Sequence, residues 1–218
     1  MTELDPDRIL ALAYVPSARR AAVAALWRLD VALGAVPATG REPMVGRIRL
    51  AWWREALERL DASPPPPEPV LEGIARHLLP AGIAGAELAA MEEGWAVLLA
   101  PERLSPGELD RYAAARGGGL FRLTARLLGA EGEILGADGE RWALVDLARC
   151  SLDPAEAAAT LDAARKRAGR ARWPTSLRPL GMLAALARRD LRRGAGRWER
   201  PGSPARMMRM LRHRLTGH

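Results

Sequence analysis

Apolar residues recur every three or four positions along most of the chain, which is the spacing of one face of an α-helix. After Ser17, for example, Ala22, Leu26, Leu29 and Leu33 fall on one stripe. The sequence has no alternating strand pattern of useful length and no Asn-Gly or Asp-Gly hairpin between β-rich runs. We therefore predict an all-α fold, a single bundle of about ten helices.

Start and stop signals place the helix boundaries. Asp5-Pro6 and Ser105-Pro106-Gly107-Glu108 are N-terminal caps, and the second of them is a capping box. The segment Pro37-Ala38-Thr39-Gly40 is expected to end the second helix, and Pro43 to begin the third. The expected helices cover residues 5–14, 17–36, 44–60, 70–79, 85–99, 105–128, 138–150, 153–170, 176–193 and 203–215.

Composition narrows the class of protein. The 218 residues are 49% hydrophobic, which is too apolar for a disordered chain, yet no run approaches the roughly 20 apolar residues of a membrane span. The acidic N-terminus is unlike a secretory signal, and the single cysteine, Cys150, excludes an intramolecular disulfide. We expect one domain over 1–218, with a polyproline linker at 63–69 inside it and a basic amphipathic tail at 203–216. A cytoplasmic location is expected, with peripheral attachment to the inner membrane as an open alternative, and the arginine and alanine bias indicates a GC-rich bacterial genome.

The net charge of +7 is distributed unevenly. Residues 1–150 carry 17 basic and 21 acidic side chains, a balance of −4, whereas residues 151–218 carry 16 basic and 5 acidic ones, a balance of +11. The C-terminal part is therefore where an anionic partner would bind. Nucleic acid is not expected there, because Trp173 and Trp198 are the only aromatic residues and no binding module is recognisable.

Two interpretations of the last helix stay open. Met207, Met208, Leu211 and Leu215 form one stripe, and arginines form another. Either the apolar stripe packs on the domain with the arginines in water, or the helix lies on an anionic membrane surface. The residues that would carry membrane binding are Arg206, Met207, Arg209, Leu211 and Arg212.

The segment 42–57 is the most distinctive in the chain because adjacent tryptophans stand beside arginines. Successive helical residues point about 100° apart, so Trp52 and Trp53 face different directions. One interpretation is that both fill the core, with Ile48, Trp52 and Leu57 facing inward. The other is that they form the wall of a deep apolar pocket with cationic edges, suited to a prenyl chain or a lipid diphosphate.

Glycines and acidic clusters add two further expectations. The run Gly117-Gly118-Gly119 inside a helical pattern predicts either a close helix–helix contact or a kink beside a cavity. The acids at 55, 58 and 61 share one helix face with arginines and are expected to be solvated. Glu92 and Glu93 are adjacent, so at most one of them can line a given site.

In order along the chain, several segments resemble the squalene/phytoene synthase family, the all-helical head-to-head prenyl transferases. Residues 5–20 resemble the family's opening segment, and 25–29 correspond to the helix that carries the first aspartate motif. Residues 112–129, with Gly118 at the family's Ala-Gly position, resemble the helix that lines the substrate cavity. Residues 42–57 and 173–217 are similar to a subgroup that includes the mitochondrial complex I assembly factor. The resemblance implies an isoprenoid synthase-like fold.

The departures from this family bear on activity. Its two aspartate boxes hold the magnesium ions that neutralise and pull off diphosphate. The first box would fall on Gly34, Ala35 and Ala38, and the acids nearest the second, at 138, 140 and 146, do not reproduce it. The resemblance therefore implies a protein that keeps the family's fold but lacks its catalytic activity. Such a protein would bind lipids or isoprenoids at a membrane, or act in assembly. We assign no catalytic residue, no metal ligand and no cofactor.

Two alternatives stay open. One is a divergent prenyl transferase of the squalene, hydroxysqualene or phytoene synthase type, or a subunit of one, which would need Mg²⁺. The other is a basic interaction module that uses only the tail. The expected partners are a prenyl lipid or prenyl diphosphate, a membrane surface or a protein, and not nucleic acid. The candidate pocket or diphosphate-binding residues are Arg19, Arg20, Arg49, Trp52, Trp53, Arg54, Tyr112, Arg116 and Gly118.

Overall fold

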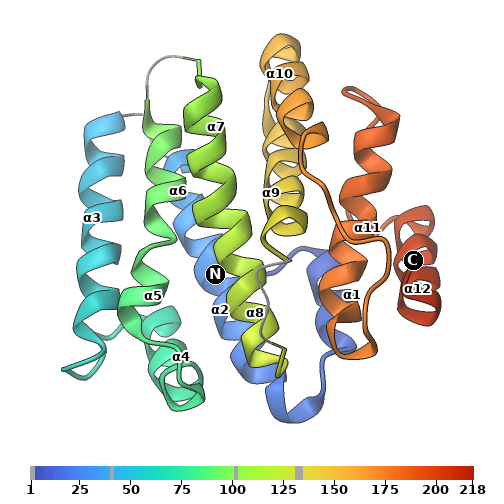
Figure 1. Ribbon diagram of the computed structural model, residues 1–218. Helices are drawn as coiled ribbons and strands as arrows, with labels where there is room; N and C mark the ends of the chain where they lie inside the picture. The colour runs from blue at the N-terminus through green and yellow to red at the C-terminus, as the bar shows by residue number, and fades with distance from the viewer. Residues whose placement is uncertain (1–2, 40–41, 101–102, 131–134) are drawn as a thin grey trace.

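The computed structural model describes residues 3–39, 42–100, 103–130 and 135–218, and this part of the chain is helical without strands, as predicted. Figure 1 shows a bundle in which α3 lies at one edge and α12 at the opposite edge. The α-helices are α1 (Pro6–Ala13), α2 (Ser17–Thr39), α3 (Pro43–Arg59), α4 (Pro69–His77), α5 (Gly85–Ala89), α6 (Glu92–Ala96), α7 (Pro106–Tyr112), α8 (Gly119–Leu127), α9 (Gly136–Cys150), α10 (Pro154–Arg165), α11 (Arg178–Arg193) and α12 (Pro204–Thr216).

Local signals set most helix starts. The Asp5 carboxylate accepts hydrogen bonds from the backbone N–H groups of Asp7 and Arg8, at 2.9 and 3.1 Å, and begins α1. Ser105 and Glu108 form the predicted reciprocal capping box at the start of α7. These caps satisfy backbone donors that the first helical turn leaves without partners.

Three boundaries differ from the sequence-based expectation. Pro37 lies inside α2, which continues to Thr39, because a proline in the last turn removes little of the helix's hydrogen bonding; Gly40 lies outside the described residues. The expected helix 85–99 is divided into α5, α6 and the 3₁₀ turn Val97–Leu99. The α10 helix ends at Arg165, several residues before the expected end.

The core of the bundle is built around α2. The predicted stripe is confirmed, since Ala22, Leu26, Leu29 and Leu33 are all buried. The Trp27 indole N–H donates to the Thr124 hydroxyl at 3.1 Å and joins α2 to α8. Contrary to the sequence-based expectation, the segment Ser17–Ala38 of α2 is long and apolar enough to span a membrane. Its most apolar 18-residue window is 56% buried inside the protein, as is typical of a core helix.

The expected inward face of α3 is partly wrong. Leu57 is buried, but Ile48 and Trp52 are 63% and 46% exposed. The helix lies at the edge of the bundle (Figure 1) and packs through a single face, on which Gly46 lies against Leu99. Positions about 90° or more from that face therefore point outward.

Candidate functional site

A π-helical turn, Ala113–Gly118, interrupts the long helix between α7 and α8. A Cβ added to Gly117 would overlap the Gly139 carbonyl, and one added to Gly139 would overlap the Gly117 carbonyl. The two glycines thus allow the turn and α9 to touch backbone to backbone, which confirms the expected close helix–helix contact. The wider turn directs the Arg116 side chain into the interior, where it is 3% exposed.

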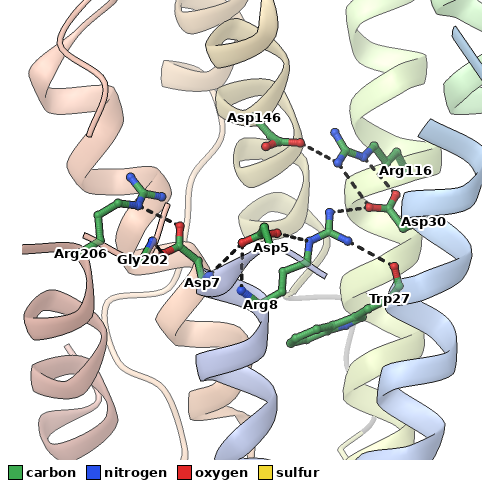
Figure 2. Close-up of polar contacts among 9 residues, drawn as sticks. All are labelled: Asp5, Asp7, Arg8, Trp27, Asp30, Arg116, Asp146, Gly202 and Arg206. Carbon is green, nitrogen blue, oxygen red and sulfur yellow. Dashed lines mark hydrogen bonds and ion pairs between the residues drawn. The ribbon is translucent and has the colours of Figure 1, made fainter. Parts of the chain in front are cut away.

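Arg116 joins carboxylates from two different helices. Its Nε donates to Asp30 Oδ1 on α2 at 3.1 Å, and its Nη2 donates to Asp146 Oδ2 on α9 at 2.7 Å. A further N–H donates to the Tyr112 hydroxyl. The guanidinium also stacks over the rings of Trp95 and Trp142, with centroids 4.2 and 4.9 Å away. Figure 2 shows this cation lying between the two aspartates.

Asp30 accepts from a second arginine on the other side. Arg8 Nη2 donates to Asp30 Oδ2 at 2.7 Å, and Arg8 Nη1 donates to the Trp27 carbonyl at 3.3 Å (Figure 2). Complete burial would raise the pKa of Asp30, but Arg116 and Arg8 outweigh that effect and hold it below its ordinary value. Asp30 is therefore a fully ionised buried carboxylate with both oxygens paired.

A second set of ion pairs continues toward the C-terminal helix. Arg206 on α12 donates from Nε to Asp7 Oδ2 at 2.8 Å and from Nη1 to Asp190 Oδ2 at 2.7 Å. Arg149 donates to the same Asp190 oxygen at 2.9 Å. Between the two sets lies a cavity of about 260 Å³, lined in part by Asp5, Trp142, Leu183 and Asp190. The pairs fix α12 to α1 and α11.

The predicted pocket residues do not meet at one place. Tyr112, Arg116, Gly118 and Trp53 are buried. Arg19, Arg20, Arg49, Trp52 and Arg54 are exposed on other faces of the bundle. Of these, Arg20 donates to the carbonyls of Ala13 and Val15, and Arg54 lies 4.0 Å from Glu92.

The space beside Tyr112 is occupied by side chains. The Tyr112 and Trp95 rings pack edge to face with centroids 5.8 Å apart, and Arg116 lies over both. A Cβ at Gly118 would stand 3.1 Å from an Arg122 nitrogen. Trp52 and Trp53 also pack edge to face, at 5.2 Å, with Trp53 buried in the core and Trp52 exposed. The described residues therefore form no deep apolar pocket at the place where the tryptophans and Tyr112 suggested one.

Sequence reasoning missed Asp30 and its partners. Four of the described acids in residues 1–150 are buried, namely Asp7, Asp30, Glu92 and Asp138, whereas Glu93 is exposed. One signal was available, because Asp30 stands four residues after Leu26, beside the apolar stripe of a core helix. A charge at such a position needs a buried partner.

The residues of the last helix that were candidates for membrane binding differ in their exposure. Arg206 is 5% exposed and ion-paired, so it cannot touch a membrane. The interpretation that the apolar stripe packs on the domain is wrong as well: Met207, Met208 and Leu215 are 40%, 68% and 78% exposed. The helix packs through Arg206, Met210 and His213 instead, which lie on a different face.

The helical architecture agrees with a comparison of the sequence with known families. The profile described as squalene/phytoene synthase matches residues 1–172. The chain belongs to the squalene/phytoene synthase family. No curated protein and no solved structure matches it.

Membership of the squalene/phytoene synthase family implies magnesium and a prenyl diphosphate, and the interior carboxylates do not fit such a metal. Mg²⁺ needs several free oxygen ligands in near-octahedral array. Asp30 on α2 and the half-buried Asp146 on α9 already hold guanidinium groups. Among the described residues no group of three or more His, Cys, Asp or Glu side chains is arranged to hold a metal ion.

Proposed function

We propose that this protein is a non-catalytic member of the squalene/phytoene synthase family that acts as a membrane-associated binding or assembly protein. The observation that carries the proposal is the position of Arg116. Its guanidinium neutralises carboxylates from two facing helices, Asp30 and Asp146. Family members place magnesium between aspartates of facing helices, whereas here a fixed side-chain cation lies between the carboxylates of α2 and α9 and balances their charge.

The energetic cost of displacing the arginines supports a guanidinium group in place of a metal ion. A metal ion could bind Asp30 only if Arg116 and Arg8, which are 3% and 7% exposed at the side chain, lost their partner inside the protein. An unpaired buried charge is costly, on the order of 3–5 kcal/mol. Without metal, the pull on a departing diphosphate is missing.

The cavity beside the buried ion pairs offers little room for a prenyl chain. The cavity of about 260 Å³ is below the 300–1,000 Å³ range of typical ligand pockets, and its lining includes four aspartates and three arginines. We propose that a lipid or isoprenoid meets this protein at its surface and not in this cavity. We place the protein in the cytoplasm with peripheral attachment to the inner membrane.

The exposed side of α3 supports the assembly part of the proposal. Residues 42–57 are the segment similar to the subgroup of the complex I assembly factor, although the family match gives no evidence for that subgroup. In this segment Met44, Ile48 and Trp52 are 64%, 63% and 46% exposed, which leaves an apolar stripe at the edge of the bundle. Such a surface is typical of a protein–protein contact.

Incubation with farnesyl or geranylgeranyl diphosphate and magnesium, followed by extraction of C30 and C40 products, tests the non-catalytic assignment. We expect no product above the level without protein. The control variant is Asp146→Asn, which removes a carboxylate that is 38% exposed and leaves Arg116 paired with Asp30. Turnover by the natural chain that Asp146→Asn abolishes would overturn the proposal and favour a divergent prenyl transferase.

A further inference from the structure

The outer side of α12 carries an apolar surface with a cationic border. We call Met207, Met208, Leu211 and Leu215 the apolar arc, because at 100° per residue they fall within about 100° of the helix circumference. Three of the four are 40–78% exposed, and Leu211 is half-buried. Helix packing does not use this arc, since Arg206, Met210 and His213 face the protein.

The border of the arc is a set of arginines without counter-ions. Arg212 adjoins the arc, Arg209 lies beyond it toward α11, and Arg192 stands on α11 itself. We call these three residues the arginine edge. Among the described residues none of the three forms an ion pair or a side-chain hydrogen bond, and no acid follows Glu199 in the sequence.

The positive charges of the arginine edge lie close enough to repel one another. Partial burial lowers the pKa of Arg209, and the charges of Arg192, Arg212 and Arg189 lower it further. An anion placed among these groups would relieve that repulsion. On the other side of the arc, Arg214 lies over the Tyr14 ring, 5.5 Å from its centroid, and Tyr14 is 38% exposed.

We propose that the apolar arc of α12 inserts at the headgroup level of a bilayer while the arginine edge binds the phosphates of anionic lipids. This inference rests on the proposed function and names the surface and the lipid class that attach the protein. Exposed apolar side chains flanked by arginine, with a tyrosine at one margin, are the arrangement of helices that lie in the membrane interface.

The exposed stripe of α3 does not have the same charge pattern. Glu55 falls inside the angular range of Met44, Ile48 and Trp52, and it is exposed with Arg59 as its partner at 3.5 Å. Insertion of that stripe would therefore bury an acid near anionic headgroups. The helices α3 and α12 lie at opposite edges of the bundle (Figure 1), so variants on α3 and on α12 change separate surfaces.

Vesicle flotation of the full chain tests the proposal. The vesicles are phosphatidylcholine alone and an equimolar mixture of phosphatidylcholine with phosphatidylglycerol. We expect flotation with the mixed vesicles only, and its loss at high salt, because screening weakens the arginine–phosphate attraction. The double variant Met208→Glu/Leu215→Glu should not float, and Arg209→Gln and Arg212→Gln should each weaken binding roughly fivefold.

Ile48→Glu is the control on α3, because it places one glutamate at a similarly exposed apolar position. It should float like the natural chain, and an unchanged melting temperature of every variant checks the fold. The inference is overturned if the natural chain does not float, if neutral vesicles bind it equally, or if the α12 double variant still floats.

The failures of the two proposals are distinguishable. If Ile48→Glu abolishes flotation and the α12 double variant does not, the membrane attaches to α3 instead of α12. Membrane association itself would then still hold. Absence of flotation would remove the membrane part of the proposed function as well. Formation of prenyl product would overturn the non-catalytic part alone.

Discussion

Arginines occupy two contrasting settings in this protein. Arg8 and Arg116 lie in the interior with side-chain exposures of 7% and 3%, and both donate to Asp30. The arginine edge of α11 and α12 lies at the surface, and within the described residues it has no acidic partner. In the part of the chain that the structure describes, the buried arginines Arg8, Arg116 and Arg206 are all ion-paired, whereas the arginine edge is not.

The difference separates structural from functional charge. A buried ion pair whose members are also hydrogen-bonded gives a fixed geometry, and it resists exchange because either partner alone would be left unsolvated. A surface cluster of like charge costs little in water and attracts anions. The first cluster therefore accounts for the loss of metal chemistry that we propose, and the second for attachment to a partner.

The variant Asp30→Asn, which should have the largest effect, tests whether the buried ion pairs are structural. It would leave two buried guanidinium groups facing a neutral side chain, and we expect the free energy of unfolding to fall by about 3–5 kcal/mol. Denaturant unfolding followed by circular dichroism measures the change. Glu55→Gln, which breaks an exposed pair with Arg59, is the control and should cost at most about 0.5 kcal/mol. A loss below 1 kcal/mol for Asp30→Asn would show that the buried network is not structural.

The π-helical turn that aims Arg116 inward can be tested through Gly117. A methyl group there would overlap the Gly139 carbonyl, so Gly117→Ala should destabilise by about 1–3 kcal/mol. Gly73→Ala in α4 is the control, because a Cβ there meets nothing within 4 Å and should instead stabilise by about 0.5–1 kcal/mol. Equal melting temperatures for both variants would refute the backbone contact.

His213 provides a test of the charge on α12, because it is a buried side chain on the same helix as Arg209 and Arg212. Burial, with Arg188, Arg209 and Arg178 nearby, lowers the pKa of His213 to about 4, and its ring packs edge to face on Trp173. The unfolded chain binds this proton below its ordinary pKa of 6.5 and the folded chain does not, so stability should fall between pH 6.5 and 4. Unfolding measured across that range should depend on pH less steeply for His213→Leu. Identical slopes would contradict the low pKa.

The smallest expected effect concerns the arginine edge itself. Arg209→Gln relieves repulsion with Arg192 and Arg212, so it should raise stability by a few tenths of a kcal/mol. Arg116→Gln should have the opposite sign and a much larger size, because it leaves Asp30 and Asp146 with one cation fewer. Thermal unfolding of the two variants side by side measures the contrast, and a destabilising Arg209→Gln would argue that the arginine edge is paired after all.

The fold could be predicted from the sequence because helix signals are local. Caps such as Asp5 and Ser105, and the stripe around Leu29, act within a few residues of one another and survive packing unchanged. The family resemblance pointed correctly to the squalene/phytoene synthases. The outward face of α3 could not be predicted, because its edge position depends on where distant helices pack.

The interior network was hidden for a similar reason. Arg8, Asp30, Arg116 and Asp146 are far apart in the sequence, and each by itself is typical of a solvated helix residue. Only the approach of α9 to the π-helical turn brings the last two together. The same limit applied to α12, where periodicity identified two stripes but not which of them faced the protein.

Titration with Mn²⁺, followed by electron paramagnetic resonance in the presence of farnesyl diphosphate, tests most directly whether Arg116 stands where a metal would. Manganese binds the same oxygen ligands as magnesium and reports its own coordination. The account predicts the same titration with and without protein, and no difference between the natural chain and Asp146→Asn. A saturable site on the natural chain that Asp146→Asn removes would contradict it.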